Sequence, residues 1–327
     1  MDFQLIGKKQ GGSRMYKYYE LIDGRVTHCP GDEEGRIAIY SDPTAEEKRF
    51  LIEEYGIDEH TLNSALDDDE LSRVEYESNH VAVILKRPSN YTADRSLEFR
   101  VVSTGAFLFK DRIIIVQAEQ SPLFEHGRIP IRGTSVQGIL LRLLHHSTHH
   151  FLEHLRIIRT ISDEIEAQIE FSVTNKALVN MFTLLKSLTY YESATSANLL
   201  LLAKLRNDAR KVGFNEEEID FLEDITVENK QCDNLANIYT GILTGMSDAR
   251  VSVVSNNLAI IMKYLAVINV VFMPINVLVG MGGMSEFTAM TEGLWWPHAY
   301  SAFLLLVVAV GYITYLLIRN IGNTTAR

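Results

Sequence analysis

A stretch of 55 residues near the carboxyl end, from Tyr264 to Ile318, contains only two charged side chains, Glu286 and Glu292. Within it lie two uncharged runs, 20 residues from Leu265 to Met284 and 19 residues from Tyr300 to Ile318. At about 1.5 Å of rise per residue, helices of this length cross the roughly 30 Å apolar core of a bilayer. We interpret the two runs as transmembrane helices. A buried hairpin of a soluble protein is the alternative, but it gives no reason for both runs to match the bilayer.

The basic residues beside the two spans predict their orientation. They lie on the flanks that face away from the connecting segment, at Arg250, Lys263, Arg319 and Arg327. The connecting segment, SEFTAMTEGLWWPH, has two Glu and no Lys or Arg. The positive-inside rule therefore places both termini in the cytoplasm and the short loop outside. We expect a multi-pass protein of the inner (plasma) membrane that contacts the lipid bilayer directly.

The rest of the composition narrows the function. The chain has 42 acidic and 31 basic residues and a formal net charge of −11, which argues against nucleic acid as a partner. Cys29 and Cys232 are too few for a disulfide framework, which favours a reducing compartment. The start, MDFQLIGKKQGG, has no apolar signal-peptide core, so the amino end is expected to stay in the cytoplasm. There is no phosphate-binding Gly loop, HExxH or CxxC, so we expect neither an enzyme nor a resident cofactor.

Residues before the spans predict a sheet domain followed by long helices. Asp23-Gly24 is a hairpin turn signal between two strand-like runs. Further strand patterns occupy residues 36–40, 74–76, 80–85, 97–103, 106–109 and 113–117, and helical patterns occupy residues 44–55 and 59–66. Longer helices are expected at 135–173 and 175–211, and a third is opened by Asn215 with Glu218 as a capping pair. No proline separates this third helix from the first span, so the two can be one continuous helix.

We therefore expect an α+β cytoplasmic domain followed by a long stalk helix and two transmembrane helices. The expected parts are a cytoplasmic α/β sheet domain at 1–134, a cytoplasmic helical bundle and stalk at 135–263, a two-helix membrane region at 264–318 with spans 265–284 and 300–318, and a cytoplasmic tail at 319–327.

The segment from Val254 to Ser285 resembles, without a gap, the pore helix of the CorA family of divalent-cation channels and transporters. The match includes the Met262-Lys263 pair, Pro274 and Gly280. The segment from Leu66 to Pro88 resembles the family more weakly. The resemblance implies a homopentamer with a funnel-shaped αβα cytoplasmic domain and an axial pore lined by the first span.

The family's Gly-x-Asn signature falls here at Gly283, Met284 and Ser285, so Ser replaces the Asn. This departure suggests a divergent branch, such as the one called CmaX or one related to the zinc-transporting branch. If the implied pentamer forms, Glu286 and Glu292 ring the outer mouth and concentrate cations there.

Asn269 and Asn276 lie one heptad apart in the first span, on the same helix face as Met262, Met273 and Gly280. Polar groups in a span are costly unless they face a water-filled cavity or a partner helix. From the residues alone, a pore lining and an interhelical hydrogen-bonding role both remain open. The resemblance favours the pore, in which Met262 and Leu265 match the family's apolar constriction and the two amides offer oxygen to a hydrated cation.

The stalk carries further candidate residues. By resemblance, Asp224 matches a carboxylate that binds a regulatory cation between subunits, and Asp248 one that faces the cytoplasmic part of the pore. Ser255 completes the predicted pore residues. A solvated helix face is the alternative for both aspartates.

Five histidines crowd the segment LLHHSTHHFLEH. His146, His150 and His154 follow one another at four-residue intervals, so adjacent turns can offer imidazoles to Zn²⁺, Ni²⁺ or Co²⁺, with Glu153 or another subunit supplying a further ligand. A polar, solvated helix face is the alternative interpretation.

These observations predict a passive channel or transporter for Mg²⁺, Co²⁺, Ni²⁺ or Zn²⁺. Two alternatives are a proton-coupled Zn²⁺ transporter and a non-conducting pentameric scaffold or sensor, for which the altered signature is the argument.

Overall fold

The computed structural model describes residues 16–22, 25–28, 35–89, 97–120, 123, 135–171, 175–293 and 295–324. The chain divides into two compact units, Met1–Met246 and Ser247–Arg327, and the boundary falls inside one helix.

The first unit is built on a seven-stranded sheet in the order β2-β1-β3-β7-β6-β5-β4. Its strands are β1 (Tyr16–Ile22), β2 (Arg25–His28), β3 (Ile37–Ser41), β4 (Arg73–Tyr76), β5 (Val81–Pro88), β6 (Val101–Leu108) and β7 (Ile113–Gln117). Strands β3 and β7 pair in parallel, and the other neighbours pair antiparallel. The predicted hairpin is present as the β1–β2 pair, while its turn residues 23–24 lie outside the described part.

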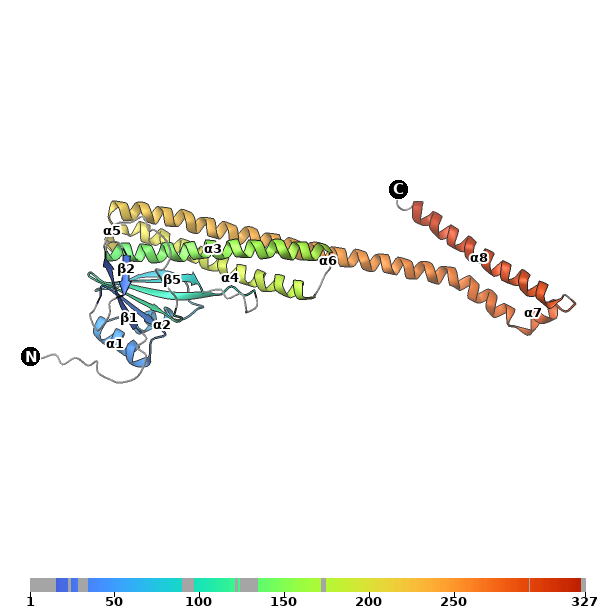
Figure 1. Ribbon diagram of the computed structural model, residues 1–327, viewed down its shortest axis with the longest axis horizontal. Helices are drawn as coiled ribbons and strands as arrows, with labels where there is room; N and C mark the ends of the chain where they lie inside the picture. The colour runs from blue at the N-terminus through green and yellow to red at the C-terminus, as the bar shows by residue number, and fades with distance from the viewer. Residues whose placement is uncertain are drawn as a thin grey trace, which may run out of the picture. The chain divides into compact units, whose positions relative to one another are not determined.

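Side chains alternate across the sheet and form a separate core on each face. Ala38 and Tyr40 of β3 pack with Leu51 and Leu62 of the helices α1 (Ala45–Tyr55) and α2 (Glu59–Ser64). Ile37 and neighbouring side chains of the opposite parity pack against the long helices. Because side chains of a strand point alternately to opposite faces, this pattern produces helix, sheet and helix layers, which Figure 1 shows. The predicted α+β architecture is confirmed.

Local hydrogen bonds explain where the shorter helices begin and end. The Glu47 N–H donates to Thr44 Oγ1 at 3.3 Å, the Thr44 N–H donates to Glu47 Oε2 at 2.8 Å, and Gly56, with φ 65°, ends α1. Asp58 caps α2 by accepting from the Thr61 N–H at 3.0 Å, and this bond is the main reason its pKa is lowered.

Two long helices, α3 (Val136–Phe171) and α4 (Asn175–Asn207), contact the strands on the second face of the sheet, and the first part of α6 (Glu216–Gly282) shares their apolar cores. The predicted capping pair of α6 is confirmed, because the Asn215 N–H donates to Glu218 Oε2 and the Glu218 N–H donates to Asn215 Oδ1, both at 2.9 Å. The expected continuity is also confirmed, since α6 contains the first apolar run.

The second unit contains the rest of α6, a short helix α7 (Ser285–Met290) and α8 (Trp296–Thr324). Among the described residues, α6 and α8 are the two helices long and apolar enough to cross a membrane. Half-buried residues mark the faces where they pack together. On α6 these are Val267, Val271, Pro274, Ile275 and Leu278, and on α8 they are Phe303, Val307, Val310, Thr314 and Ile318.

Three boundary predictions are wrong. Strands expected at 97–103 and 106–109 are the single strand β6, in which Gly105 pairs with Ile84 and its missing side chain leaves room for Ala65. The helix expected over 175–211 stops at Asn207 and resumes as α5 (Ala209–Val212), which Gly213 ends at φ 86°. The connection expected as a loop contains α7, and the second helix begins at Trp296, before Tyr300.

Candidate ion pathway and cation sites

The predicted pore residues of α6 all lie away from α8. Met262, Leu265, Met273, Asn269, Asn276 and Gly280 are exposed in the single chain. At 3.6 residues per turn, the mean direction of these six residues is about 180° around the helix from the mean direction of the five that pack toward α8. The amide side chains of Asn269 and Asn276 therefore lie on the face turned away from α8. Their hydrogen bonds must be made with another neighbour or with water.

The same face continues toward the stalk. Asp248 and Ser255 are exposed and lie on it at helical spacing, as predicted. From Asp248 to Met262 the face also includes Val251 and Leu258, which are exposed and which the sequence analysis did not select. Counting in steps of three and four residues from Met262 would have found both.

The signature residues close the first membrane helix. The Gly283 N–H bonds to the carbonyls of Val279 and Gly280 at 3.2 and 3.3 Å, and the Met284 N–H bonds to the Met281 carbonyl at 3.2 Å. Ser285 then opens α7 and is exposed. Glu292 is exposed after α7, while the side chain of Glu286 lies outside the described part.

Asp224 lies on α6 in the first unit, and its side chain is exposed. Neighbouring residues Phe221, Leu222 and Ile225 are buried, so the helix turns its apolar side inward and leaves this carboxylate on the outer surface. This placement suits a ligand that another subunit completes, and it equally suits an ordinary solvated residue.

The candidate metal ligands His146, His150 and His154 all lie on α3, and a site completed by another subunit stays a prediction. His154 is buried, and its Nδ1 lies 2.6 Å from the Tyr191 hydroxyl oxygen on α4. Burial lowers the pKa of His154 to about 4. The ring centroids of His146 and His150 are 6.2 Å apart, and those of His150 and His154 are 4.3 Å apart. In the described part of the chain, no three His, Cys, Asp or Glu side chains are placed to hold a metal ion.

The other two histidines of this segment have carboxylate neighbours instead. His145 Nε2 lies 3.7 Å from Glu228 Oε2 on α6, and His149 Nε2 lies 3.4 Å from Glu153 Oε1. Burial is the main cause of a lowered pKa at His145. The segment therefore serves as a contact between helices in this chain.

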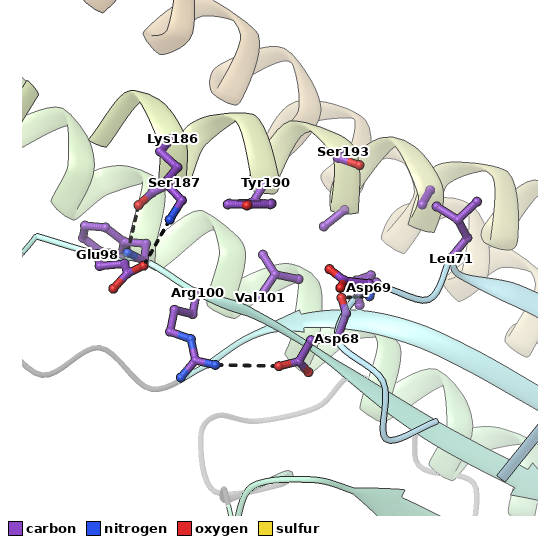
Figure 2. Close-up of a pocket in the computed structure, with 14 residues that line it drawn as sticks. Asp68, Asp69, Leu71, Glu98, Arg100, Val101, Lys186, Ser187, Tyr190 and Ser193 are labelled. Carbon is purple, nitrogen blue, oxygen red and sulfur yellow. Dashed lines mark hydrogen bonds and ion pairs between the residues drawn. The ribbon is translucent and has the colours of Figure 1, made fainter. Parts of the chain in front are cut away.

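A pocket of about 340 Å³ lies in the first unit between α4 and the residues that lead into β6 (Figure 2). Its charged lining residues are Asp68, Asp69, Glu98, Lys86, Arg100 and Lys186. Figure 2 shows Arg100 pointing to Asp68 and Lys186 to Glu98, at N···O distances of 3.7 and 3.8 Å. Three acids balance three bases, so the pocket has no net attraction for a cation. No sequence signal predicted it, because its walls come from segments up to 129 positions apart, from Asp68 to Ala197.

Comparison with known proteins decides the family. The model of the family described as CorA-like Mg²⁺ transporter protein matches residues 33–319, which is most of the chain. The chain belongs to this family. The cobalt/magnesium transport protein CorA of Methanocaldococcus jannaschii is 23% identical over 278 residues, covering 81% of this chain and 86% of the relative.

Solved structures agree on the fold of this CorA-like chain. The complete CorA magnesium transporter from M. jannaschii matches with a TM-score of 0.69 and 19% identity, over 94% of this chain and 96% of that one. Full-length CmaX matches with a TM-score of 0.72 and 16% identity, over 95% of this chain and 99% of that one. Both similarities extend over the soluble unit and the two apolar helices. The resemblance found in the sequence is thereby confirmed.

Proposed function

We propose that this CorA-like protein conducts divalent metal cations through an axial pore lined by α6 in a homopentamer. The observation that carries the proposal is the position of Asn269 and Asn276, which lie in the apolar span on the face opposite to α8. Amides in a span need a partner or water. When α8 covers the other side, copies of α6 arranged around an axis can turn these amides to a common water-filled pore.

The cation class follows from the ligands. Amide oxygens and the Asp248 carboxylate are hard ligands that suit a hydrated Mg²⁺ or Co²⁺, the ions named for the M. jannaschii relative. Met262 and Leu265 add an apolar constriction that can close by dewetting. Transport is passive and is driven by the electrochemical gradient of the cation. The protein lies in the inner membrane, with both termini in the cytoplasm.

Regulation and ion capture are further parts of the proposal. Asp224, exposed on α6, binds a regulatory divalent cation with a neighbouring subunit. Gly283, Met284 and Ser285 form the outer mouth with Glu286 and Glu292, whose carboxylates concentrate cations there. Divalent cations are the cargo and the regulators, and no resident cofactor is needed.

Uptake into liposomes tests the proposal. The purified chain should carry Mg²⁺ or Co²⁺ into vesicles down a concentration gradient, and Asn276→Leu should abolish this flux because it removes an oxygen ligand at nearly constant size. Val277→Leu, one position along the same helix, is the matched control and should conduct normally. If the native chain assembles but moves no cation, it is a scaffold or sensor. If Asn276→Leu disperses the oligomer while residual assemblies still conduct, the amide holds helices together and does not line the pore.

A further inference from the structure

Gly311 is the one buried residue among the described residues of the second unit. It lies on the α8 face that packs against α6, between the half-buried residues Val310 and Thr314. A Cβ atom placed on Gly311 would lie 3.0 Å from Ile275 Cδ1 and 3.7 Å from Ile275 Cγ1. The first distance is tighter than ordinary carbon contact, so the end of the Ile275 side chain would have to shift by a few tenths of an ångström. The absence of a side chain at Gly311 therefore lets Ile275 of α6 approach the α8 backbone.

Small residues commonly set helix contacts in membranes, where packing replaces the hydrophobic effect as the main driving force. Here the contact also has a rotational consequence. Ile275 immediately precedes Asn276, and the two side chains point about 100° apart around α6. Seating Ile275 against Gly311 therefore determines the direction in which Asn276 projects.

We infer that Gly311 is a positioning residue for the ion pathway: its contact with Ile275 fixes the rotation of α6 and so aims Asn276 at the pore. This inference rests on the proposed function, because it assigns a cause to the orientation of the same amide face. A larger residue at position 311 displaces or rotates α6 and moves the amide away from the axis. The chemistry of conduction stays with Asn276, and Gly311 acts on it only through Ile275.

The total side-chain volume at this contact can be kept constant by moving carbon atoms from α6 to α8. Gly311→Val adds three carbon atoms to α8, and Ile275→Ala removes three from α6. The single Gly311→Val variant should overpack the contact, whereas the double variant restores the carbon count and should restore the approach of the helices.

The test measures the exposure of position 276 as well as flux. In a chain with both native cysteines changed to alanine, Asn276→Cys should react with a water-soluble thiosulfonate reagent added to the assembled protein. Gly311→Val should slow this reaction about tenfold, because the overpacked contact turns position 276 away from water. The Gly311→Val/Ile275→Ala pair should recover the rate. In chains that keep Asn276, Gly311→Val should lower the cation flux, and the Gly311→Val/Ile275→Ala pair should restore it.

The control is Ala309→Val on α8, which adds two carbon atoms at an exposed position and should leave both readouts unchanged. Gly311→Val that lowers the unfolding temperature but leaves the modification rate and flux intact would show that the contact is only structural. Loss of flux that the second substitution does not rescue also overturns the inference. A different pair of results would refute the proposed pore. In that case Asn276→Cys does not react in the chain that keeps Gly311, and Asn276→Leu leaves the cation flux unchanged.

Discussion

Asn198 on α4 bonds to both backbone groups of Lys86 on β5: its Oδ1 accepts from the Lys86 N–H at 3.0 Å and its Nδ2 donates to the Lys86 carbonyl at 2.7 Å. The Ser72 hydroxyl also donates to Asn198 Oδ1, at 2.8 Å. The side chain is buried, so these bonds are shielded from water. One amide thus completes the hydrogen bonding of a strand and attaches the helical bundle to the sheet.

Asn198→Ala should therefore destabilise the first unit strongly. It leaves the buried Lys86 N–H without its acceptor, and an unsatisfied buried group costs about 1–3 kcal/mol. We expect a loss of roughly 2–4 kcal/mol in the free energy of unfolding, measured with denaturant on the full chain in detergent. Asn237→Ala is the matched control, because its Nδ2 makes one exposed bond to the Asp233 carbonyl at 3.1 Å. Equal effects of the two substitutions would contradict this account.

Acidification should destabilise the bundle at His154. Its pKa falls from an ordinary value of 6.5 to about 4 in the folded chain, so the unfolded chain takes up the proton first. The stabilising contribution is complete above about pH 6.5 and is lost as the pH falls toward 4. The unfolding temperature of the native chain should drop between pH 7.5 and 5. His154→Gln keeps a polar partner for Tyr191 and should flatten this dependence. His149→Gln, at a ring that is about half exposed, should not flatten it.

A substitution in the apolar constriction should increase cation flux, whereas Asn276→Leu should abolish it. Leu265→Ala widens the face that Leu265 and Met262 share, which lowers the cost of wetting a closed gate. Basal Mg²⁺ leak through liposomes should increase, with the oligomer intact by cross-linking. Val270→Ala, an exposed position off this face, is the control. A leak equal to that of the native chain would place the gate elsewhere.

Ser285 predicts weak discrimination among cations. A Ser hydroxyl is shorter than the amide of the family signature and rotates freely, so a ring of such groups holds the shell of a hydrated ion less specifically. Charge at Glu286 and Glu292 then dominates capture, and flux should decrease as ionic strength rises. Ser285→Asn should sharpen the flux ratios among Mg²⁺, Co²⁺ and Zn²⁺ under matched gradients. Ratios unchanged by this substitution would locate selectivity at another part of the pore.

Topology can be checked with a single cysteine. Thr291→Cys lies in the connection between the two apolar helices, and an impermeant thiol reagent should label it from outside intact cells. A reporter fused after Arg327 should remain cytoplasmic. Labelling that requires cell lysis would reverse the proposed orientation.

Several of these features could be predicted from sequence because they depend on neighbouring residues alone. Charge-free runs of bilayer length, the Asn215–Glu218 capping pair and the strand expected at 36–40 all follow from local pattern. The structure contains them as two long apolar helices, a reciprocal cap and β3. The heptad spacing of Asn269 and Asn276 likewise placed them on one face. It left open whether that face met a partner helix.

Tertiary packing decided what local pattern could not. Ile275 packs against Gly311, so α8 covers one face of α6. Asn269 and Asn276 lie on the opposite face and remain exposed in the single chain. Histidine spacing offered His154 as a metal ligand, and only the tertiary structure shows that its Nδ1 lies 2.6 Å from the hydroxyl oxygen of Tyr191, 37 positions away. Asn198 reaches Lys86 across 112 positions. Spacing along one helix fixes which residues share a face, whereas the identity of the neighbour on that face depends on how distant segments pack.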